Sequence, residues 1–148
     1  MGNHSYRTTA SSIAAPSVVF EVLADAERWK NWISTIGRSS YERTGDPAPH
    51  GVGAIRVFGP RFGPLSREEV VEYEPPHRFG YIILSGFLPI KDYKATVVLT
   101  EKANGTTIDW SGSFSSRVPL MAAFLGKTVS GFAKALAREA DRRAGAAN

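Results

Sequence analysis

Cysteine is absent from this chain of 148 residues. Its absence excludes disulfides, thiolate nucleophiles, zinc–thiolate sites and iron–sulfur clusters. Long hydrophobic runs are also lacking, since no apolar stretch approaches the roughly 20 residues that a membrane-spanning helix needs. Residues 1–12 are polar and lack the apolar centre of a signal peptide. We therefore expect a cytoplasmic protein without integral membrane association.

Acidic residues are fewer than basic ones, with 14 Asp and Glu against 18 Lys and Arg and a net charge of +4. The basic residues are spread along the chain, and their densest group, within residues 127–143, is interrupted by Glu139 and Asp141. Such a pattern is typical of a solvated helix face. Motifs of nucleic-acid recognition are absent as well, so no nucleic-acid partner is expected.

The composition is that of a folded protein, because 43% hydrophobic and 22% charged residues exclude wholesale disorder. The length suits one domain over residues 1–148, and a chain of this size buries about 68–70% of its unfolded surface. Internal repeats, linkers and low-complexity segments are absent.

Hydrophobic period and turn residues predict one strand, two short helices, six further strands and one long helix. A first strand is expected at 6–14, and Pro16 then opens a helix, because proline in a first turn lacks only an N–H that would have no partner. A second short helix is expected at 26–33. The pattern then changes to short segments separated by Gly and Pro, which predict strands at 38–44, 53–59, 65–74, 78–85, 92–101 and 106–115. Asn104-Gly105 predicts a tight hairpin.

The last third of the chain predicts a helix over residues 117–143, capped by Ser115 or Ser116 and followed by Gly145. Its length would be about 40 Å. One face carries larger side chains, namely Met121, Leu125, Thr128, Phe132 and Leu136, with Phe124 at the margin. A second side carries small residues that favour close approach of a neighbouring backbone: Ala122, Gly126, Ala133, Ala137 and Ala140.

These elements predict an α+β fold in which a curved antiparallel sheet of about seven strands wraps around the long helix, with the two short helices between the first and second strands. Such curvature leaves a hollow, because the helix cannot reach the far wall everywhere.

Four segments resemble one known superfamily: IAAPSVVFEVLADAERWKNW (13–32), GVG (51–53), REEVVEYEPPHRF (67–79) and GTTIDW (105–110). They are similar to the START/Bet v 1-like superfamily (SRPBCC), specifically its polyketide cyclase/dehydrase-like branch of small bacterial proteins. Lys30 stands where that branch often has proline. The resemblance implies a helix-grip fold with a hydrophobic cavity between sheet and C-terminal helix that holds lipophilic molecules. It implies no fixed reaction.

Alternation of side chains along the strands assigns the face that would line such a cavity. Ala95 and Gly112 are small residues on that face and would leave volume unfilled, while Tyr81 and Tyr93 need partners for their hydroxyls and are candidate donors to a ligand. The expected cavity lining is Trp32, Ile55, Val71, Tyr81, Ile83, Tyr93, Ala95, Val97, Trp110, Gly112, Phe114, Met121, Phe124, Leu125, Thr128 and Phe132.

Two loops, 58–65 and 85–90, are unusually apolar. Exposed apolar loop tips mark lids, partner surfaces or membrane-touching edges. We expect Phe62, Phe87 and Leu88 to gate the cavity mouth, with packing over the sheet edge as the alternative. Arg61 and Lys91 lie in or beside these loops and are placed to attract an anionic head group.

Candidate acid–base groups are few. Glu68 and Glu69 are adjacent in a strand and point to opposite faces, so one of them could enter the cavity, where burial would raise its pKa. A solvated strand face is the alternative interpretation. The candidate catalytic residues are Glu69, Tyr81, Tyr93 and Arg56. His4, His50 and His77 are scattered without ligand spacing, so neither a metal nor an organic cofactor is expected.

The preferred hypothesis is a module that binds a hydrophobic or amphipathic small molecule of the lipid, polyketide or isoprenoid class. One alternative is a cyclase or dehydratase that uses cavity Tyr, Glu and Arg side chains. A second alternative is a protein-interaction or stress-related module that uses the apolar loops. Both a monomer and a homodimer are compatible with the sequence.

Overall fold

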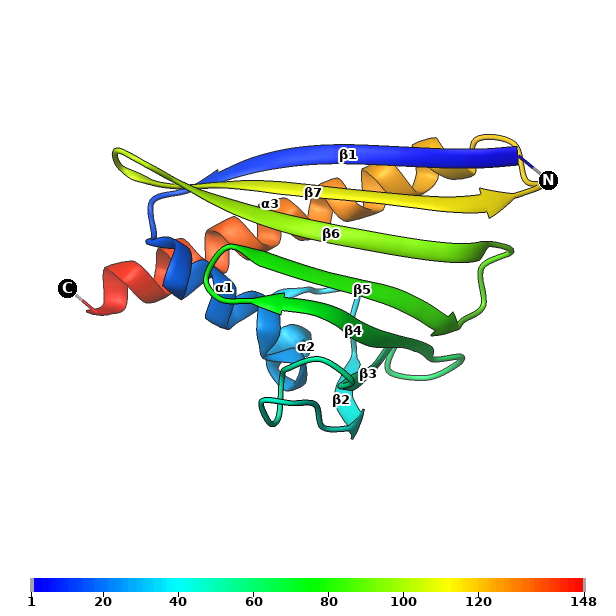
Figure 1. Cartoon of the computed structure of the whole chain (residues 1–148), viewed down its shortest axis with the longest axis horizontal. Coiled ribbons are helices and arrows are strands. Elements are labelled where there is room, and N and C mark those ends of the chain that lie inside the picture. Colours follow the sequence, from blue (N-terminus) through cyan, green and yellow to red (C-terminus); the bar gives the residue numbers. More distant parts are fainter. Residues whose placement is uncertain (1, 148) are drawn as a thin grey trace.

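Seven antiparallel strands form one sheet in the order β1-β7-β6-β5-β4-β3-β2, and a long helix crosses its concave side (Figure 1). The computed structural model describes residues 2–147. The strands are β1 (Gly2–Ser12), β2 (Arg38–Arg43), β3 (Ile55–Gly59), β4 (Ser66–Glu74), β5 (Arg78–Ser85), β6 (Lys91–Lys102) and β7 (Gly105–Ser116). The helices are α1 (Pro16–Ala24), a single 3-10 turn (Ala26–Arg28), α2 (Trp29–Trp32) and α3 (Met121–Ala147).

The predicted α+β helix-grip fold is confirmed. The predicted hairpin at Asn104-Gly105 joins β6 to β7, with Lys102 paired to Gly105. Gly105 has φ of +141°, and a Cβ there would lie 1.9 Å from the Ser12 carbonyl oxygen, so only glycine fits this turn.

The long helix begins and ends later than predicted. Leu120 has φ of +66°, which breaks the helix before Met121. The Ser116 hydroxyl accepts the Val118 N–H at 3.1 Å and donates to the Pro89 carbonyl at 2.9 Å, so it holds the preceding loop and caps no helix. Gly145 lies inside α3, because the chain does not turn there.

The small-residue side of α3 packs closely against the rest of the fold. α3 lies mainly against β1 and α1, with Ala133, Ala137 and Ala140 buried. A Cβ on Gly126 would lie 3.5 Å from Tyr6 Cβ, which shows how near β1 approaches. Met121, Leu125 and Leu136 are buried as predicted, whereas Phe124 is 53% exposed.

The predicted alternation is confirmed on β6 and β7. The inward residues of these two strands are all buried: Tyr93, Ala95, Val97, Leu99, Ile108, Trp110, Gly112 and Phe114. They share the core with Phe79 and Tyr81 of β5 and with Val19, Leu23 and Trp29 from the α1–α2 region.

The prediction for β4 and β3 is wrong by one residue. Glu68 and Val70 are buried, while Glu69 lies on the outer face and Val71 is half-buried and unpaired. The sheet register is irregular between Val70 and Glu72, so counting back in twos from the inward Tyr73 selects the wrong residues. Ile55 pairs with Glu69 and shares its face of the sheet, where it is only 6% exposed, while the neighbouring Arg56 is fully buried on the other face.

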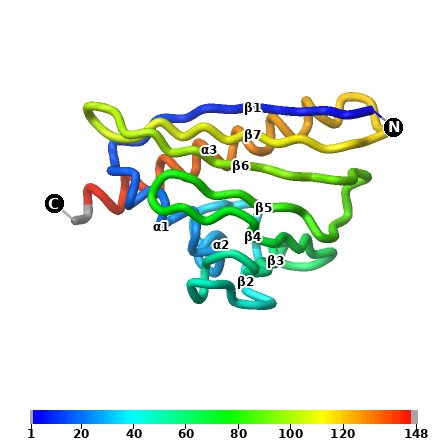
Figure 2. The backbone as a smooth tube through the Cα atoms, viewed as in Figure 1, coloured from blue at the N-terminus to red at the C-terminus, as the bar shows by residue number. Residues whose placement is uncertain are grey.

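One end of the molecule carries three of its connections. The β3–β4, β5–β6 and β7–α3 connections all lie there, near the start of β1, whereas α3 ends at the opposite end (Figure 2). We call this the loop end and define it by residues 60–65, 86–92 and 117–124. Within residues 2–147, no helix combines the length and apolar character needed to span a membrane.

Glu139 forms salt bridges with two arginines of α3, and their contribution to stability can be measured. Arg142 donates to its two carboxylate oxygens at 2.9 and 2.7 Å and Arg143 donates at 2.9 Å, and these bonds lower the pKa of Glu139 to about 2. A lowered pKa stabilises the fold above the ordinary pKa of a carboxyl group, and that stability is lost as the pH falls. Because Arg142 is 67% exposed, Glu139→Gln should cost only about 0.5–1 kcal/mol at neutral pH.

Urea unfolding of both proteins between about pH 7 and about pH 2 measures this effect. The difference in unfolding free energy should shrink as the pH falls. A difference that stays constant over the range would contradict an ion-pair origin.

Candidate functional site

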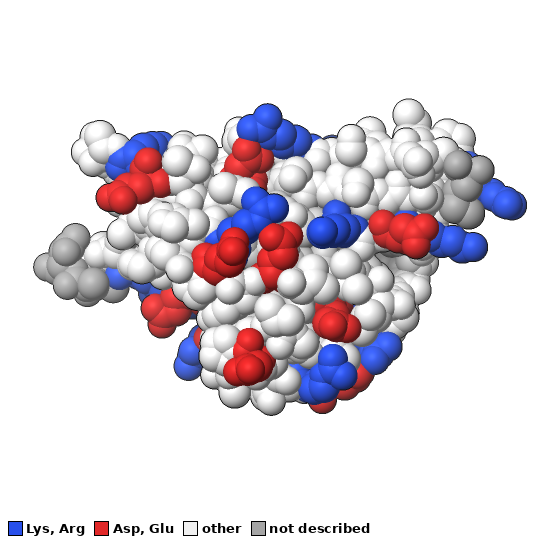
Figure 3. All heavy atoms as spheres, viewed as in Figure 1, with Lys and Arg blue, Asp and Glu red and all other residues white. Residues whose placement is uncertain are grey.

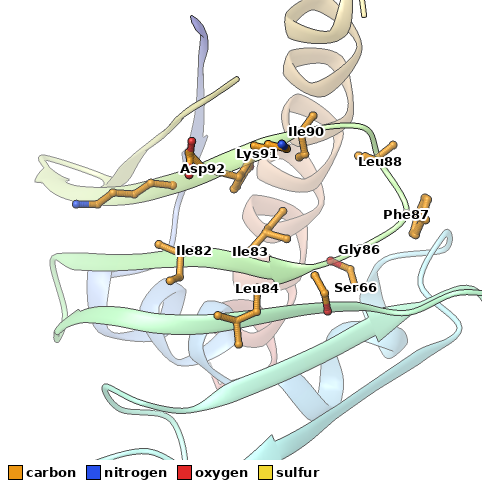
Figure 4. A pocket seen from close by; sticks show the side chains of 13 residues that line it. Ser66, Ile82, Ile83, Leu84, Gly86, Phe87, Leu88, Ile90, Lys91 and Asp92 are labelled. Atoms are coloured by element: carbon orange, nitrogen blue, oxygen red, sulfur yellow. The ribbon is translucent and has the colours of Figure 1, made fainter. Parts of the chain in front are cut away.

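The sheet opens between β5 and β6. These strands pair from Arg78–Val98 to Ile82–Lys94 and then separate toward the loop end. The gap holds a pocket of about 670 Å³, with α3 behind it (Figure 4). Its lining comes from β4, β5, β6 and the β5–β6 connection: Ser66, Ile82, Ile83, Leu84, Ser85, Gly86, Phe87, Leu88, Ile90, Lys91, Asp92, Tyr93 and Lys94.

The pocket combines apolar walls with polar groups at its rim. Ile83, Leu88 and Ile90 pack against the core, while Phe87 is 57% exposed and leaves the pocket open to solvent. Lys91 and Lys94 are exposed, and neither forms a salt bridge with any described residue. An apolar molecule with a polar or acidic head would therefore find complementary groups here.

Tyr93 connects the pocket to a row of buried hydroxyls on the concave face. Its hydroxyl is hydrogen-bonded to that of Tyr6, and its ring centroid lies 6.1 Å from that of Tyr81. Trp110 Nε1 donates to the Tyr81 hydroxyl at 3.2 Å. The row thus crosses the sheet from β1 through β6 to β5.

Burial keeps these three tyrosines protonated. Loss of hydration raises the pKa of Tyr6, Tyr81 and Tyr93 above the ordinary value, and the nearby Glu68 carboxylate raises each pKa further. They are therefore hydrogen-bonding hydroxyls at physiological pH and not phenolate bases.

The small residues of this row make room for Tyr6. Tyr6 pairs with Gly112, Gly112 with Ala95 and Ala95 with Tyr81. A Cβ on Gly112 would lie 2.5 to 2.6 Å from ring and hydroxyl atoms of Tyr6. The unfilled volume expected beside Gly112 is therefore occupied by the Tyr6 ring.

A buried ion pair lies at the other end of the row. Arg56 is fully buried, and its Nε donates to Glu68 Oε1 at 3.0 Å while its Nη2 contacts the same oxygen. Nη1 donates to the Leu23 carbonyl at 3.2 Å. The guanidinium carbon is surrounded by aromatic rings, at 4.7 Å from the centroid of Trp29, 4.7 Å from Phe79, 5.2 Å from Phe58 and 5.6 Å from Tyr81.

The environment of this pair sets the pKa of Glu68. Loss of hydration raises the pKa of Glu68, and the adjacent Arg56 opposes that rise. The aromatic rings hold the guanidinium by cation–π contact. Arg56 is thus held in place beneath the tyrosine row. None of its hydrogen-bond or cation–π partners lines the pocket.

Comparison with known proteins assigns the chain to a family. A family model described as "Polyketide cyclase / dehydrase and lipid transport" matches residues 3–145. The chain belongs to this family. Uncharacterised proteins of Mycobacterium tuberculosis and Mycobacterium bovis are 32% identical over 76 residues, which cover 51% of this chain and 44% of theirs. The match therefore spans less than half the length of these relatives.

Solved structures share the fold of this family member. A START superfamily protein from Mycobacterium smegmatis has a TM-score of 0.79 at 12% identity, with 94% of this chain and 98% of that chain covered. Ara h 8.0201 has a TM-score of 0.77 at 15% identity with the same coverage. A protein of Nitrosospira multiformis has a TM-score of 0.76 at 19% identity, covering 91% and 94%. At these identities the likeness shows the helix-grip fold alone.

The predicted site residues of this polyketide cyclase/dehydrase family member fall into distinct places. Ile83, Tyr93, Phe87 and Leu88 line the pocket. Tyr81, Arg56, Ala95, Val97, Trp110, Gly112, Phe114, Met121 and Leu125 are buried in the interior. Trp32, Thr128 and Phe132 are half-buried, and Phe62 and Phe124 are exposed. Glu69 lies on the outer face of the sheet, Val71 is half-buried at the irregularity of β4, and Ile55, which pairs with Glu69, is only 6% exposed.

Sequence reasoning missed several residues of the site. Tyr6 belongs to the buried row, and Ile82, Leu84 and Ile90 belong to the pocket. Of the two adjacent carboxylates, the candidate chosen from the sequence was Glu69, whereas Glu68 is the buried one. Tyr6 is the large residue that pairs with Gly112 of β7, and no local pattern in the sequence marks that pairing. The indole nitrogen of Trp32 is buried without a hydrogen-bond partner among the described residues.

Proposed function

We propose that this chain binds a hydrophobic or amphipathic small molecule, of the lipid, polyketide or isoprenoid class, in the pocket between β5 and β6. The pocket itself carries the proposal. Its volume of about 670 Å³ lies within the roughly 300–1,000 Å³ of pockets that hold small ligands. Six of its side chains are large and apolar, and Lys91 and Lys94 offer positive charge to an acidic head.

The buried hydroxyl row supports a polar anchor for that molecule. Tyr93 belongs both to the pocket lining and to the row. A ligand oxygen that reached Tyr93 would exchange hydrogen bonds with a protonated hydroxyl held in place by its neighbours. The apolar walls would bind the rest of the molecule by removing its surface from water.

Native mass spectrometry of freshly purified protein is the first test. A co-purifying mass that is lost on unfolding would support the proposal and identify the ligand class. If the protein is isolated empty, titration with 1-anilinonaphthalene-8-sulfonate, an apolar anion, replaces this measurement.

A pocket-filling substitution makes that titration decisive. Ile83→Trp places an indole in the pocket and should weaken probe binding about tenfold or more, which corresponds to roughly 1.4 kcal/mol or more. Val52→Trp introduces the same side chain at an exposed position outside the pocket and should leave binding unchanged. Phe87→Ser, at a 57% exposed position, supplies a second pocket variant in case Ile83→Trp alters the fold. Unchanged binding in both pocket variants would refute the proposal.

A second candidate function is a cyclase or dehydratase, which the family description includes. The observation that favours it is the Tyr93 hydroxyl, because a protonated phenol at a pocket wall can donate to a substrate carbonyl oxygen. Tyr93→Phe should then abolish turnover of a poly-β-ketone while probe binding persists. Equal turnover in the variant would remove Tyr93 from any such role.

A further inference from the structure

The loop end exposes large apolar side chains from three separate connections. Phe62 and Leu120 are each 81% exposed, and Phe87 and Phe124 are 57% and 53% exposed. Leu65 and Val118 add partly exposed surface beside them. Single exposed apolar residues are common, but several at one end of a molecule mark a surface that binds a membrane or a protein partner.

Leu120 is held there against its backbone preference. Its φ of +66° lies in the left-handed region that bulky side chains avoid. Because the side chain is 81% exposed, the strain is not offset by packing within this chain. Residues held in such a backbone conformation cluster at functional sites.

The same end carries unpaired positive charge. Arg61, Lys91 and Arg117 lie in its connections, and Lys127 lies in the second turn of α3. Asp92 is the single acidic residue within 60–65, 86–92 and 117–124. No salt bridge between described residues involves these four basic side chains, whereas eight arginines elsewhere are paired with carboxylates. Figure 3 shows basic side chains projecting at this end, while acidic and basic groups alternate over the sheet face.

We propose that the loop end docks on the surface of an anionic lipid bilayer. Apolar tips that enter the acyl boundary, with cations level with the lipid phosphates, are the two contributions that bind a protein peripherally to such a membrane. The unpaired positive charges favour a negatively charged surface, which an anionic bilayer presents. The pocket between β5 and β6 opens at this end, so docking brings its mouth to the membrane.

Co-sedimentation with vesicles tests the proposal. Wild-type protein should bind phosphatidylcholine vesicles that contain about 30% phosphatidylglycerol more tightly than vesicles of pure phosphatidylcholine. The double variant Arg61→Gln/Arg117→Gln should weaken binding by about fivefold for each charge removed. The double variant Phe62→Ser/Leu120→Asn should also weaken it, and asparagine suits the left-handed backbone at position 120.

The control is Ile13→Ser, which removes a 70% exposed apolar side chain outside the loop end and should bind vesicles like the wild type. Ile83→Trp should also bind vesicles normally, so a failure of the ligand-binding proposal is distinguished from a failure of this one. Equal binding to neutral and anionic vesicles, no binding to either, or unchanged binding in both loop-end variants would overturn the proposal. If the loop end bound a protein partner and the chain did not bind vesicles, the proposal would be overturned too.

Discussion

Arg56→Met should lower the free energy of unfolding by about 3–5 kcal/mol. The substitution removes the guanidinium that pairs with Glu68 and leaves a carboxylate that is only 7% exposed among aromatic rings. A buried charge without a partner costs far more than the ion pair itself contributes. Methionine retains much of the volume, so a cavity contributes little to the loss. Chemical denaturation at neutral pH measures the change.

The pH dependence of this variant reports on Glu68 directly. Burial already raises the pKa of Glu68, and loss of Arg56 removes the group that opposes the rise. A carboxyl group whose pKa is higher in the folded state stabilises the protein when protonated, and that stability is lost as the pH rises through the folded pKa. The penalty of Arg56→Met should therefore be largest at neutral pH and smaller under acidic conditions.

Two further variants separate the cost of a buried, unpaired carboxylate from the contribution of an exposed ion pair. Arg56→Met/Glu68→Leu removes both charges and should recover most of the lost stability, because an apolar pair leaves nothing unsatisfied. Arg67→Met breaks an exposed ion pair with Glu42 and should cost less than about 1 kcal/mol. If the double variant were as unstable as Arg56→Met, the unpaired carboxylate would not be the cause.

Gly112→Val should lower the free energy of unfolding by about 2–3 kcal/mol. The new Cβ would lie 2.5 Å from the Tyr6 hydroxyl oxygen and 2.6 Å from its ring, so the side chain must leave its place over β7 and lose its hydrogen bond to Tyr93. Overpacking of a filled core position has this cost because the neighbours can move only into strained positions. Thermal unfolding monitored by circular dichroism measures the change.

The matched control lies on the same strand. Ser113→Val introduces the same side chain at an exposed position of β7, where β propensity favours valine, and should not destabilise the protein. Combining Gly112→Val with Tyr6→Ala should cost less than the sum of the single changes, because the valine would occupy space that the ring vacates. Additive costs would show that Tyr6 does not fill the space beside Gly112.

Local patterns of the sequence determined most of the architecture. The start of α1 at Pro16, the hairpin at Asn104-Gly105 and the inward faces of β6 and β7 were all predictable. Each depends on a few neighbouring residues, since turn chemistry and the two-residue period of a strand are properties of short segments. The predicted order of elements was therefore correct, and with it the helix-grip fold.

The tertiary structure alone decided the interior of the candidate site. Glu68 and not Glu69 faces inward because a strand irregularity shifts the alternation, and such an irregularity is set by pairing with β5. Arg56 lies inside because Glu68, 12 residues away, neutralises it. Tyr6 covers Gly112 across the β1–β7 pairing, and the pocket exists because β5 and β6 separate beyond Ile82. Contacts between distant segments decide these features, and no local period records which segments will meet.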